Sequence, residues 1–262
     1  MDTKPLIISI SNQKGGVGKS TTAYNLAACL ALKHSKKVVL IDLDPQANLS
    51  EYLGYEPDGK VTLTQLVMTV CMSGSITPEI MGAAIRHSEK AGVDYIPSDI
   101  NLANSEMIMQ TALSRETVIR RILTENVFKE YDFVIIDCLP SLGTLLINAL
   151  TAADLLLIPT QTQKFSLDGL EALVSLYEQI RTAINPKLKL SGILPTMVEH
   201  TGVSRKALEE LHEKYGEMLF RTKISKSVEA VKSSENGKPL CLTNHKLGKE
   251  YDEFTQEVLS GC

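Results

Sequence analysis

Short runs of leucine and β-branched residues alternate along this chain with longer segments of helical periodicity. The runs are apolar on both faces, which is typical of buried strands in a parallel sheet, and the helical segments supply the crossovers between them. The expected strands are Leu6–Ile10, Lys37–Ile41, Val93–Ile96, Phe133–Ile136, Leu155–Ile158 and Leu190–Leu194, with a last one near Met218–Lys223. The expected helices span residues 20–33, 101–113, 115–128, 166–183 and 203–215. The pattern predicts an α/β fold with a doubly wound, mostly parallel sheet and helices on both faces.

Residues 54–90 are the least regular part of the pattern. They contain four glycines and two prolines, so we expect short helices and loops there. No repeat, low-complexity tract or linker interrupts the chain. At 262 residues, of which 44% are hydrophobic, the chain can bury one full core. We therefore expect a single domain over residues 1–262.

A glycine-rich turn joins the first expected strand to the first expected helix. Residues 13–22 read Q-K-G-G-V-G-K-S-T-T. Such a turn aims backbone N–H groups and the positive end of the helix dipole at one point, where a polyphosphate binds. In the usual scheme Gly18 lets the backbone approach the phosphates, Lys19 reaches the β- and γ-phosphates and the Ser20 hydroxyl binds magnesium. The turn predicts a nucleotide site.

The turn departs from the common pattern G-x-x-x-x-G-K-[ST], because its first glycine position is Gln13, and it carries an additional lysine, Lys14. In this it resembles the deviant phosphate-loop (deviant Walker A) ATPases of the ParA/MinD family, a branch of the P-loop NTPases. The resemblance implies ATP as the nucleotide, with Mg²⁺. It also implies that Lys14 crosses the interface of a homodimer to the nucleotide of the partner subunit.

The second expected strand leads into Asp42-Leu43-Asp44-Pro45-Gln46, which resembles the D-x-D-P-Q segment of ParA-type ATPases. The resemblance implies that Asp44 orients or activates the attacking water and belongs to the metal site. Asp42 is then expected to support Lys19 or the metal-bound waters. The alternative for Asp44 is a structural role as a helix N-cap, with Pro45 at the first helical position.

The fourth expected strand, Phe133–Ile136, is followed directly by Asp137. This is the Walker B arrangement, which places a carboxylate where it can hold a water of magnesium opposite Ser20. The family more often has D-x-P-P after such a strand, whereas Leu139 stands at the first proline position here. The segment that follows Asp137 is the second switch of the family, and how stiff it is in this chain is therefore left open.

Two further strand ends resemble family motifs. Residues 159–163 read P-T-Q-T-Q where the family has P-x-Q-x-E, and we assign Gln163 no catalytic role. Pro195-Thr196-Met197 corresponds to the family position near the adenine base, although a buried strand end is the alternative for Met197. The resemblance runs from about residue 6 to residue 240. It assigns nucleotide binding to Lys14, Gly15, Gly16, Val17, Gly18, Lys19, Ser20, Thr21, Pro195, Thr196 and Met197, magnesium to Ser20, Asp44 and Asp137, and catalysis to Lys14, Lys19 and Asp44.

The formal net charge of −4 is distributed unevenly. Residues 181–262 carry 13 Lys and Arg against 11 Asp and Glu, whereas residues 1–180 carry 14 against 20. Residues 221–238 have a surplus of about three positive charges, which is enough for sequence-independent phosphate contacts if a dimer doubles the patch. The family's I-P-R-N-V-R stretch is I-S-K-S-V-E here, so one of its basic positions has become acidic; a solvated helix face is the alternative. The candidate DNA contacts are Arg221, Lys223, Lys226 and Lys232.

Five scattered cysteines without a C-x-x-C pair favour reduced thiols, and the first residues lead straight into the first expected strand. We therefore expect a cytoplasmic protein, and the resemblance implies that it associates with the nucleoid when ATP is bound. No run approaches the ~18 apolar residues that cross a bilayer. The C-terminal segment 249–259 has an acidic polar side, whereas a membrane-surface helix would carry lysine and arginine there. No membrane partner is expected.

The resemblance implies a slow ATPase that forms an ATP sandwich dimer, binds double-stranded DNA non-specifically as that dimer, and is stimulated by a ParB-like centromere-binding protein. Such a protein segregates or positions a plasmid, a chromosome or a mobile element. One alternative is a MinD-type positioning ATPase at a membrane. Others are an adaptor that carries a protein cargo without DNA, and an electron-transfer ATPase resembling nitrogenase iron protein, which needs cluster cysteines.

Overall fold

A seven-stranded sheet forms the centre of the computed structural model, which describes residues 4–162 and 167–261. The strand order is β3-β4-β2-β5-β1-β6-β7, and all neighbouring strands are parallel except β3 and β4. The predicted α/β fold with a mostly parallel sheet is confirmed. The strands are β1 (Leu6–Ile10), β2 (Val38–Leu43), β3 (Arg86–Ser88), β4 (Val93–Ile96), β5 (Phe133–Cys138), β6 (Leu155–Gln161) and β7 (Lys189–Thr196).

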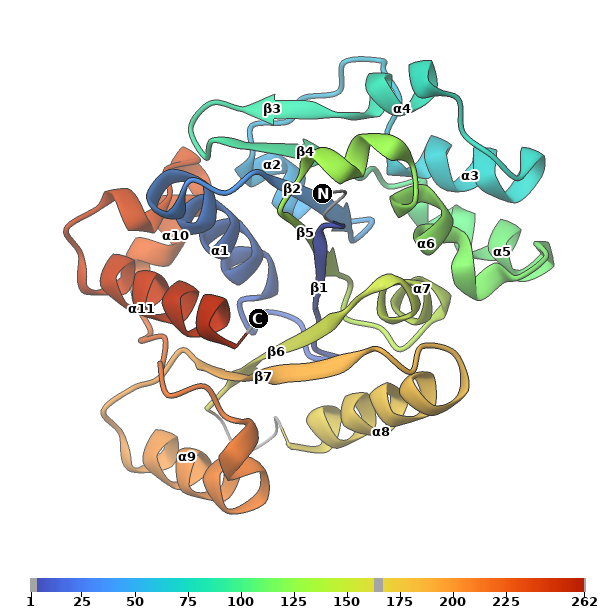
Figure 1. Ribbon diagram of the computed structural model, residues 1–262. Helices are drawn as coiled ribbons and strands as arrows, with labels where there is room; N and C mark the ends of the chain where they lie inside the picture. Colours follow the sequence, from blue (N-terminus) through green and yellow to red (C-terminus); the bar gives the residue numbers. More distant parts are fainter. Residues whose placement is uncertain (1–3, 163–166, 262) are drawn as a thin grey trace.

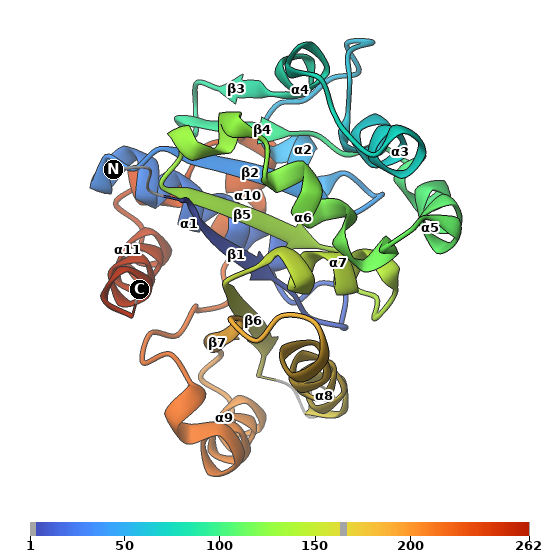
Figure 2. The ribbon, with the colours of Figure 1, turned by 45° about the vertical axis from the view of Figure 1, so that its right-hand side comes forward.

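Helices cover both faces of this sheet (Figure 1). Alternate strand residues enter two cores: Ile8 and Leu40 are buried in the cluster under α1 and α11, whereas Val39 and Ile41 are buried in the cluster on the other face. Figure 2 shows α3, α5, α6, α7 and α8 on that second face. The helices are α1 (Lys19–His34), α2 (Asn48–Tyr52), α3 (Leu63–Ser73), α4 (Pro78–Ala84), α5 (Leu102–Thr111), α6 (Val118–Leu123), α7 (Thr144–Ala152), α8 (Leu167–Ala183), α9 (Gly202–Tyr215), α10 (Val228–Asn236) and α11 (Lys246–Ser260).

Two expected elements differ from the structure. The helix expected over residues 115–128 is broken into a 3₁₀ turn (Arg115–Thr117), α6 and a second 3₁₀ turn (Asn126–Glu130). The strand expected near Met218–Lys223 is wrong, because only Leu219 bridges to Ile193 of β7, and a 3₁₀ turn (Gly216–Met218) precedes it. The irregular region 54–90 contains α3, α4 and the unexpected edge strand β3.

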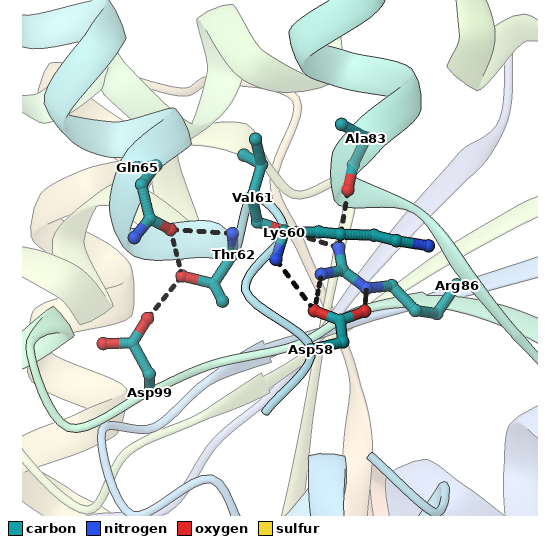
Figure 3. A network of polar contacts seen from close by, with 8 residues as sticks. All are labelled: Asp58, Lys60, Val61, Thr62, Gln65, Ala83, Arg86 and Asp99. Carbon is teal, nitrogen blue, oxygen red and sulfur yellow. Dashed lines mark hydrogen bonds and ion pairs between the residues drawn. The ribbon is translucent and has the colours of Figure 1, made fainter. Parts of the chain in front are cut away.

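A polar network fastens the loop after α2 to the edge of the sheet (Figure 3). The guanidinium of Arg86 in β3 forms an ion pair with Asp58, 2.9 Å from Oδ1, and also donates to the carbonyl of Ala83 at 2.8 Å. Thr62, just before α3, donates its backbone N–H to Gln65 Oε1 at 2.7 Å and its hydroxyl to Asp99. These bonds fix the start of α3 and give the buried guanidinium its partners.

The C-terminal helix α11 packs its apolar side into the protein. Leu247, Tyr251, Phe254 and Val258 are all buried in the core cluster that also contains α1. Within the described ranges, no helix has the length and apolar character that crossing a membrane requires.

Candidate functional site

The glycine-rich turn forms an open cradle between β1 and α1. Gly16 and Gly18 have φ values of 72° and 89°, in the left-handed region that glycine adopts without strain. A Cβ placed on Gly15, Gly16 or Gly18 would meet no atom within 4 Å. Gly18 is the N-cap of α1 and supplies no side-chain cap, so the first N–H groups of that helix are available to a ligand. The cradle has the shape and polarity that a polyphosphate requires.

Two side chains anchor the cradle to neighbouring strands. Asn12 donates to the carbonyl of Pro159 in β6 at 2.7 Å and accepts from the backbone N–H of Lys14 at 2.9 Å. Thr196 in β7 donates its hydroxyl proton to the carbonyl of the buried Val17 at 2.8 Å. The sequence analysis had no role for Asn12, because its partner lies far along the chain.

Lys19 lies beneath the cradle with its side chain almost fully buried. Its ammonium group donates to the carbonyl of Lys14 at 3.4 Å. Burial lowers the pKa of Lys19, and the carboxylates of Asp137 and Asp44 oppose that shift. The charged form of a lysine buried in this way is stabilised by an added negative charge, which a phosphate would provide.

Asp137 is the most unusual group of the site. Its side chain is 1% exposed, and neither carboxyl oxygen has a hydrogen bond of ordinary geometry with the described residues. Burial raises the pKa of Asp137 well above its usual value, and the neighbouring Asp42 raises it further, whereas the Ser20 hydroxyl and Lys19 lower it. A buried carboxyl group without partners is costly to keep unless something binds to it.

The donor set around Asp137 fits magnesium. The Ser20 hydroxyl and the Asp137 carboxyl group are hard oxygen ligands beside the phosphate cradle. No group of three or more His, Cys, Asp or Glu side chains in the described ranges is arranged to hold a metal ion. A magnesium ion here would therefore take most of its ligands from water and phosphate oxygens, which is how Mg²⁺ is usually bound.

Asp42, which pairs in register with Asp137 across β2 and β5, has a different environment. It accepts hydrogen bonds from the backbone N–H of Ser50 at 2.8 Å, the Ser50 hydroxyl at 2.7 Å and the backbone N–H of Asp44 at 3.1 Å. Burial raises the pKa of Asp42 to about 6, against the effect of these three donors. These bonds go to Ser50 of α2 and to Asp44, and none of them joins Asp42 to Lys19; support of the metal-bound waters by Asp42 stays a prediction.

Asp44 lies half-buried on the wall of the phosphate cavity. Its Oδ1 accepts from the backbone N–H of Gln46 at 2.9 Å, and the helix that follows begins only at Asn48, with Ala47 as its N-cap. The alternative role of Asp44 as a helix N-cap is therefore wrong. Among the contacts described for Asp44, none occupies the other carboxyl oxygen, Oδ2. A water molecule in the cavity could therefore donate to it.

The side chain of Lys14 contacts the last residue of β6. The ammonium group of Lys14 donates to Gln161 Oε1 at 3.4 Å. Gln161 is the glutamine of the P-x-Q-x-E motif, but its contact with Lys14 was not expected from the sequence. Gln163, on which the sequence analysis commented, lies outside the described residues.

Two adjoining cavities lie along the cradle. One, of ≈ 340 Å³, is bounded by the glycines, Lys19, Ser20, Thr21, Asp44 and Pro140. The other, of ≈ 610 Å³, is lined by apolar and hydroxyl side chains including Val17, Thr196, Met197 and Tyr251. They share Gly18, Thr21, Tyr52 and Met197, so a ligand with a phosphate chain and a flat base could occupy both.

Pro195, expected near the base, does not line this second cavity. Its carbonyl accepts from the backbone N–H of Ile224 at 2.9 Å, and its ring borders a separate groove on α9. Thr196 and Met197 do line the cavity. Met197 has a φ of 50°, in the left-handed region, where the chain turns beside the cavity.

The candidate DNA contacts are spread over the segment that leads to α10 and over α10 itself. Lys226 forms an ion pair with Glu199 at 3.2 Å, and Lys232 one with Glu229 at 2.7 Å. The largely exposed Arg221 lies 3.6 Å from Glu257. Lys223 is exposed in the groove against α9. The structure therefore does not gather these four residues into one free basic patch.

Comparison with known proteins agrees with this geometry. A protein-family model described as an AAA domain matches residues 6–190. The chain is 38% identical over 255 residues to sporulation initiation inhibitor protein Soj from Bacillus subtilis, covering 96% of this chain and 97% of that protein. It is 34% identical to chromosome partitioning protein ParA from Caulobacter vibrioides, covering 99% of this chain and 96% of that protein.

Solved structures with bound nucleotide are also similar to this chain. Cobyrinic acid a,c-diamide synthase from Mycobacterium smegmatis, with a bound ATP analogue and magnesium, superposes with a TM-score of 0.82 at 31% identity, over 97% of this chain and 94% of that one. A plasmid partition protein from Borrelia burgdorferi bound to AMPPNP gives a TM-score of 0.79 at 25% identity, over 99% and 100%. By sequence identity over nearly its whole length, the chain belongs to the Soj/ParA family of P-loop partitioning ATPases.

Proposed function

We propose that this chain is a single-domain, Mg²⁺-dependent ATPase that switches between a monomer and an ATP sandwich dimer, and that the dimer binds DNA non-specifically to segregate or position a plasmid, a chromosome or a mobile element. The observation that carries the proposal is the buried carboxyl group of Asp137, which has no hydrogen bond of ordinary geometry with the described residues, beside an open glycine cradle with Lys19. A similar protein solved with an ATP analogue and magnesium, and another solved with AMPPNP, support the choice of ligands.

Each residue has a physical task in this proposal. The cradle N–H groups and Lys19 neutralise phosphate charge, and Ser20 and Asp137 orient the magnesium ion, which withdraws charge from the phosphate oxygens when bound. Asp44 accepts a hydrogen bond from the attacking water and so orients it. Lys14 leaves Gln161 and reaches the nucleotide of the second subunit. Thr196 and Met197 border the base.

The proposed partners follow from the family. The relatives named Soj and ParA are a sporulation inhibitor and a chromosome partitioning protein, which supports a cytoplasmic protein that meets the nucleoid and a ParB-like protein. A membrane partner is disfavoured, because the apolar side of α11 is already buried against α1.

One observation favours a second candidate, a positioning ATPase that carries a protein cargo without DNA. Three of the four candidate DNA contacts, Arg221, Lys226 and Lys232, already lie beside carboxylates. Paired cations release fewer counterions on meeting a polyanion, so DNA affinity would be weakened. The nucleotide site is the same in both candidates.

The test is ATP turnover combined with molar mass from light scattering, with Mg²⁺ or with EDTA. We expect slow hydrolysis that requires Mg²⁺, and a dimer with Mg²⁺ and the non-hydrolysable AMPPNP but not with ADP. Hydrolysis without a change of mass would contradict the switch, and a lack of nucleotide binding would contradict the proposal as a whole.

A further inference from the structure

The second switch, residues 139–143, leads into a helix whose own residues supply no side-chain N-cap. These residues join β5, which contains Asp137, to α7. Pro140 in this segment borders the phosphate cavity. The N-cap of α7 is Gly143, which has no side chain to satisfy the first N–H groups. Leu145 and Leu146 in the first turn are completely buried, so water does not reach these groups readily.

The missing cap comes from another helix. Glu106 of α5 accepts the backbone N–H of Leu145 with Oε1 at 3.1 Å. The same oxygen is so close to Gly143 that a Cβ there would lie only 2.8 Å away. A carboxylate at this position also interacts favourably with the positive end of the α7 dipole.

Glu106 can hold α7 because α5 is itself fixed. Leu102, Ser105 and Met109 are buried, and the Ser105 hydroxyl donates to the carbonyl of Leu102 at 2.6 Å. Within the switch, Ser141 accepts from the backbone N–H of Gly143 at 3.2 Å. The segment is therefore attached at one end to β5 and at the other to α5.

We propose that Glu106 is a positioning residue of the ATP site: from α5 it fixes the N-terminus of α7, and through residues 139–143, which follow Asp137 and β5, it fixes the setting of Pro140 at the phosphate cavity. Leu139 stands where a second proline would have restricted the backbone of this segment directly. The inference rests on the proposed ATPase function for its effect on turnover, but the contact with α7 stands without it.

The test compares Glu106→Ala and Glu106→Gln with the wild type. Glu213→Ala, which removes an exposed glutamate from α9, is the matched control. Hydrogen exchange over residues 139–147 is measured without nucleotide and with Mg²⁺ and AMPPNP. The Mg²⁺ concentration for half-maximal ATP turnover is measured on the same samples.

We expect Glu106→Ala to speed exchange at the start of α7 by about fivefold or more without nucleotide, the factor that accompanies loss of one buried hydrogen bond. The half-maximal Mg²⁺ concentration should rise by a similar factor. Exchange in the glycine cradle should stay as in the wild type, which excludes general unfolding. Glu106→Gln keeps an acceptor oxygen and should retain most of both properties, and Glu213→Ala all of them.

Wild-type exchange at the start of α7 together with a wild-type Mg²⁺ dependence in Glu106→Ala would overturn the proposal. Should Glu106→Ala fail to fold, the shorter Glu106→Asp takes its place, with the same two outcomes. Failure of the proposed function is distinguishable, because the wild type itself would then lack turnover while the exchange comparison without nucleotide would still report on Glu106.

Discussion

Replacing Asp137 with asparagine should stabilise the nucleotide-free protein, although it removes a residue that we assign to the magnesium site. The wild-type carboxyl group is buried without a hydrogen-bond partner of ordinary geometry and lies beside Asp42. An amide at this position carries no charge, and removing the cost of burying a charge beside Asp42 is worth about 1–3 kcal/mol. In a protein of this size ~1 kcal/mol shifts the melting temperature by roughly 2–4 °C. The expected rise is therefore about 2–12 °C in thermal melts with EDTA.

Asp42→Asn is the matched control, since Asp42 lies at the paired position of the adjacent strand. Its carboxylate accepts three hydrogen bonds, and an amide would turn a donor toward some of these donors. We expect a loss of about 1–3 kcal/mol instead of a gain. Equal destabilisation by both substitutions would refute the reasoning, because it would mean that Asp137 is as well satisfied as Asp42.

The stabilisation should also depend on pH. Burial and Asp42 raise the folded-state pKa of Asp137 above its value in the unfolded chain, so the folded protein binds this proton more tightly. Wild-type stability from this group is full below the unfolded pKa of about 4 and is lost as the pH rises through the folded pKa. The advantage of Asp137→Asn should grow across that window. An advantage that shrinks with rising pH would contradict the assignment.

Three further predictions concern the site and its support. Lys14→Ala should bind ADP as the wild type does but form no AMPPNP dimer in light scattering; a normal dimer would remove the role of Lys14 across the interface. Asp44→Ala should bind ATP and hydrolyse it poorly in a phosphate-release assay, whereas unchanged turnover would leave Asp44 only its bond to Gln46. Arg86→Ala should lower the free energy of unfolding by about 1–3 kcal/mol in urea, because Asp58 and two carbonyls lose their donor. Lys232→Ala, which breaks an exposed pair, should cost less than ~1 kcal/mol, and equal losses would contradict the burial argument.

The sheet could be predicted because strands buried on both faces are continuous apolar runs. β1 and β5 are examples, and both were expected within two residues of their bounds. β3 was missed because its three residues, Arg86, His87 and Ser88, have no apolar pattern and pair only along the edge with β4. The strand expected near Met218–Lys223 failed for the opposite reason: its apolar residues pack against β7 and α11 without forming a ladder.

The candidate site could be predicted as far as residues are neighbours in the sequence. The glycine cradle, Lys19 and the two acidic strand ends each have a local pattern, and parallel strands bring their carboxyl ends together. Contacts that join distant segments have no such pattern. Asn12 with Pro159, Lys14 with Gln161 and Glu106 with Leu145 became visible only in three dimensions. The ion pair of Lys226 was likewise hidden, because its partner, Glu199, lies outside the basic segment.

The most direct test of the account is binding to non-specific duplex DNA without nucleotide, with ADP, and with ATP in Asp44→Ala, across a series of salt concentrations. The account predicts binding with ATP alone, weakening steeply with salt. Lys223→Glu should weaken that binding, whereas Lys129→Glu, the same charge change in the 3₁₀ turn before β5, should not. Absence of DNA binding in every nucleotide state, with AMPPNP dimers still forming, would contradict the DNA-tethered switch and favour the protein-cargo candidate.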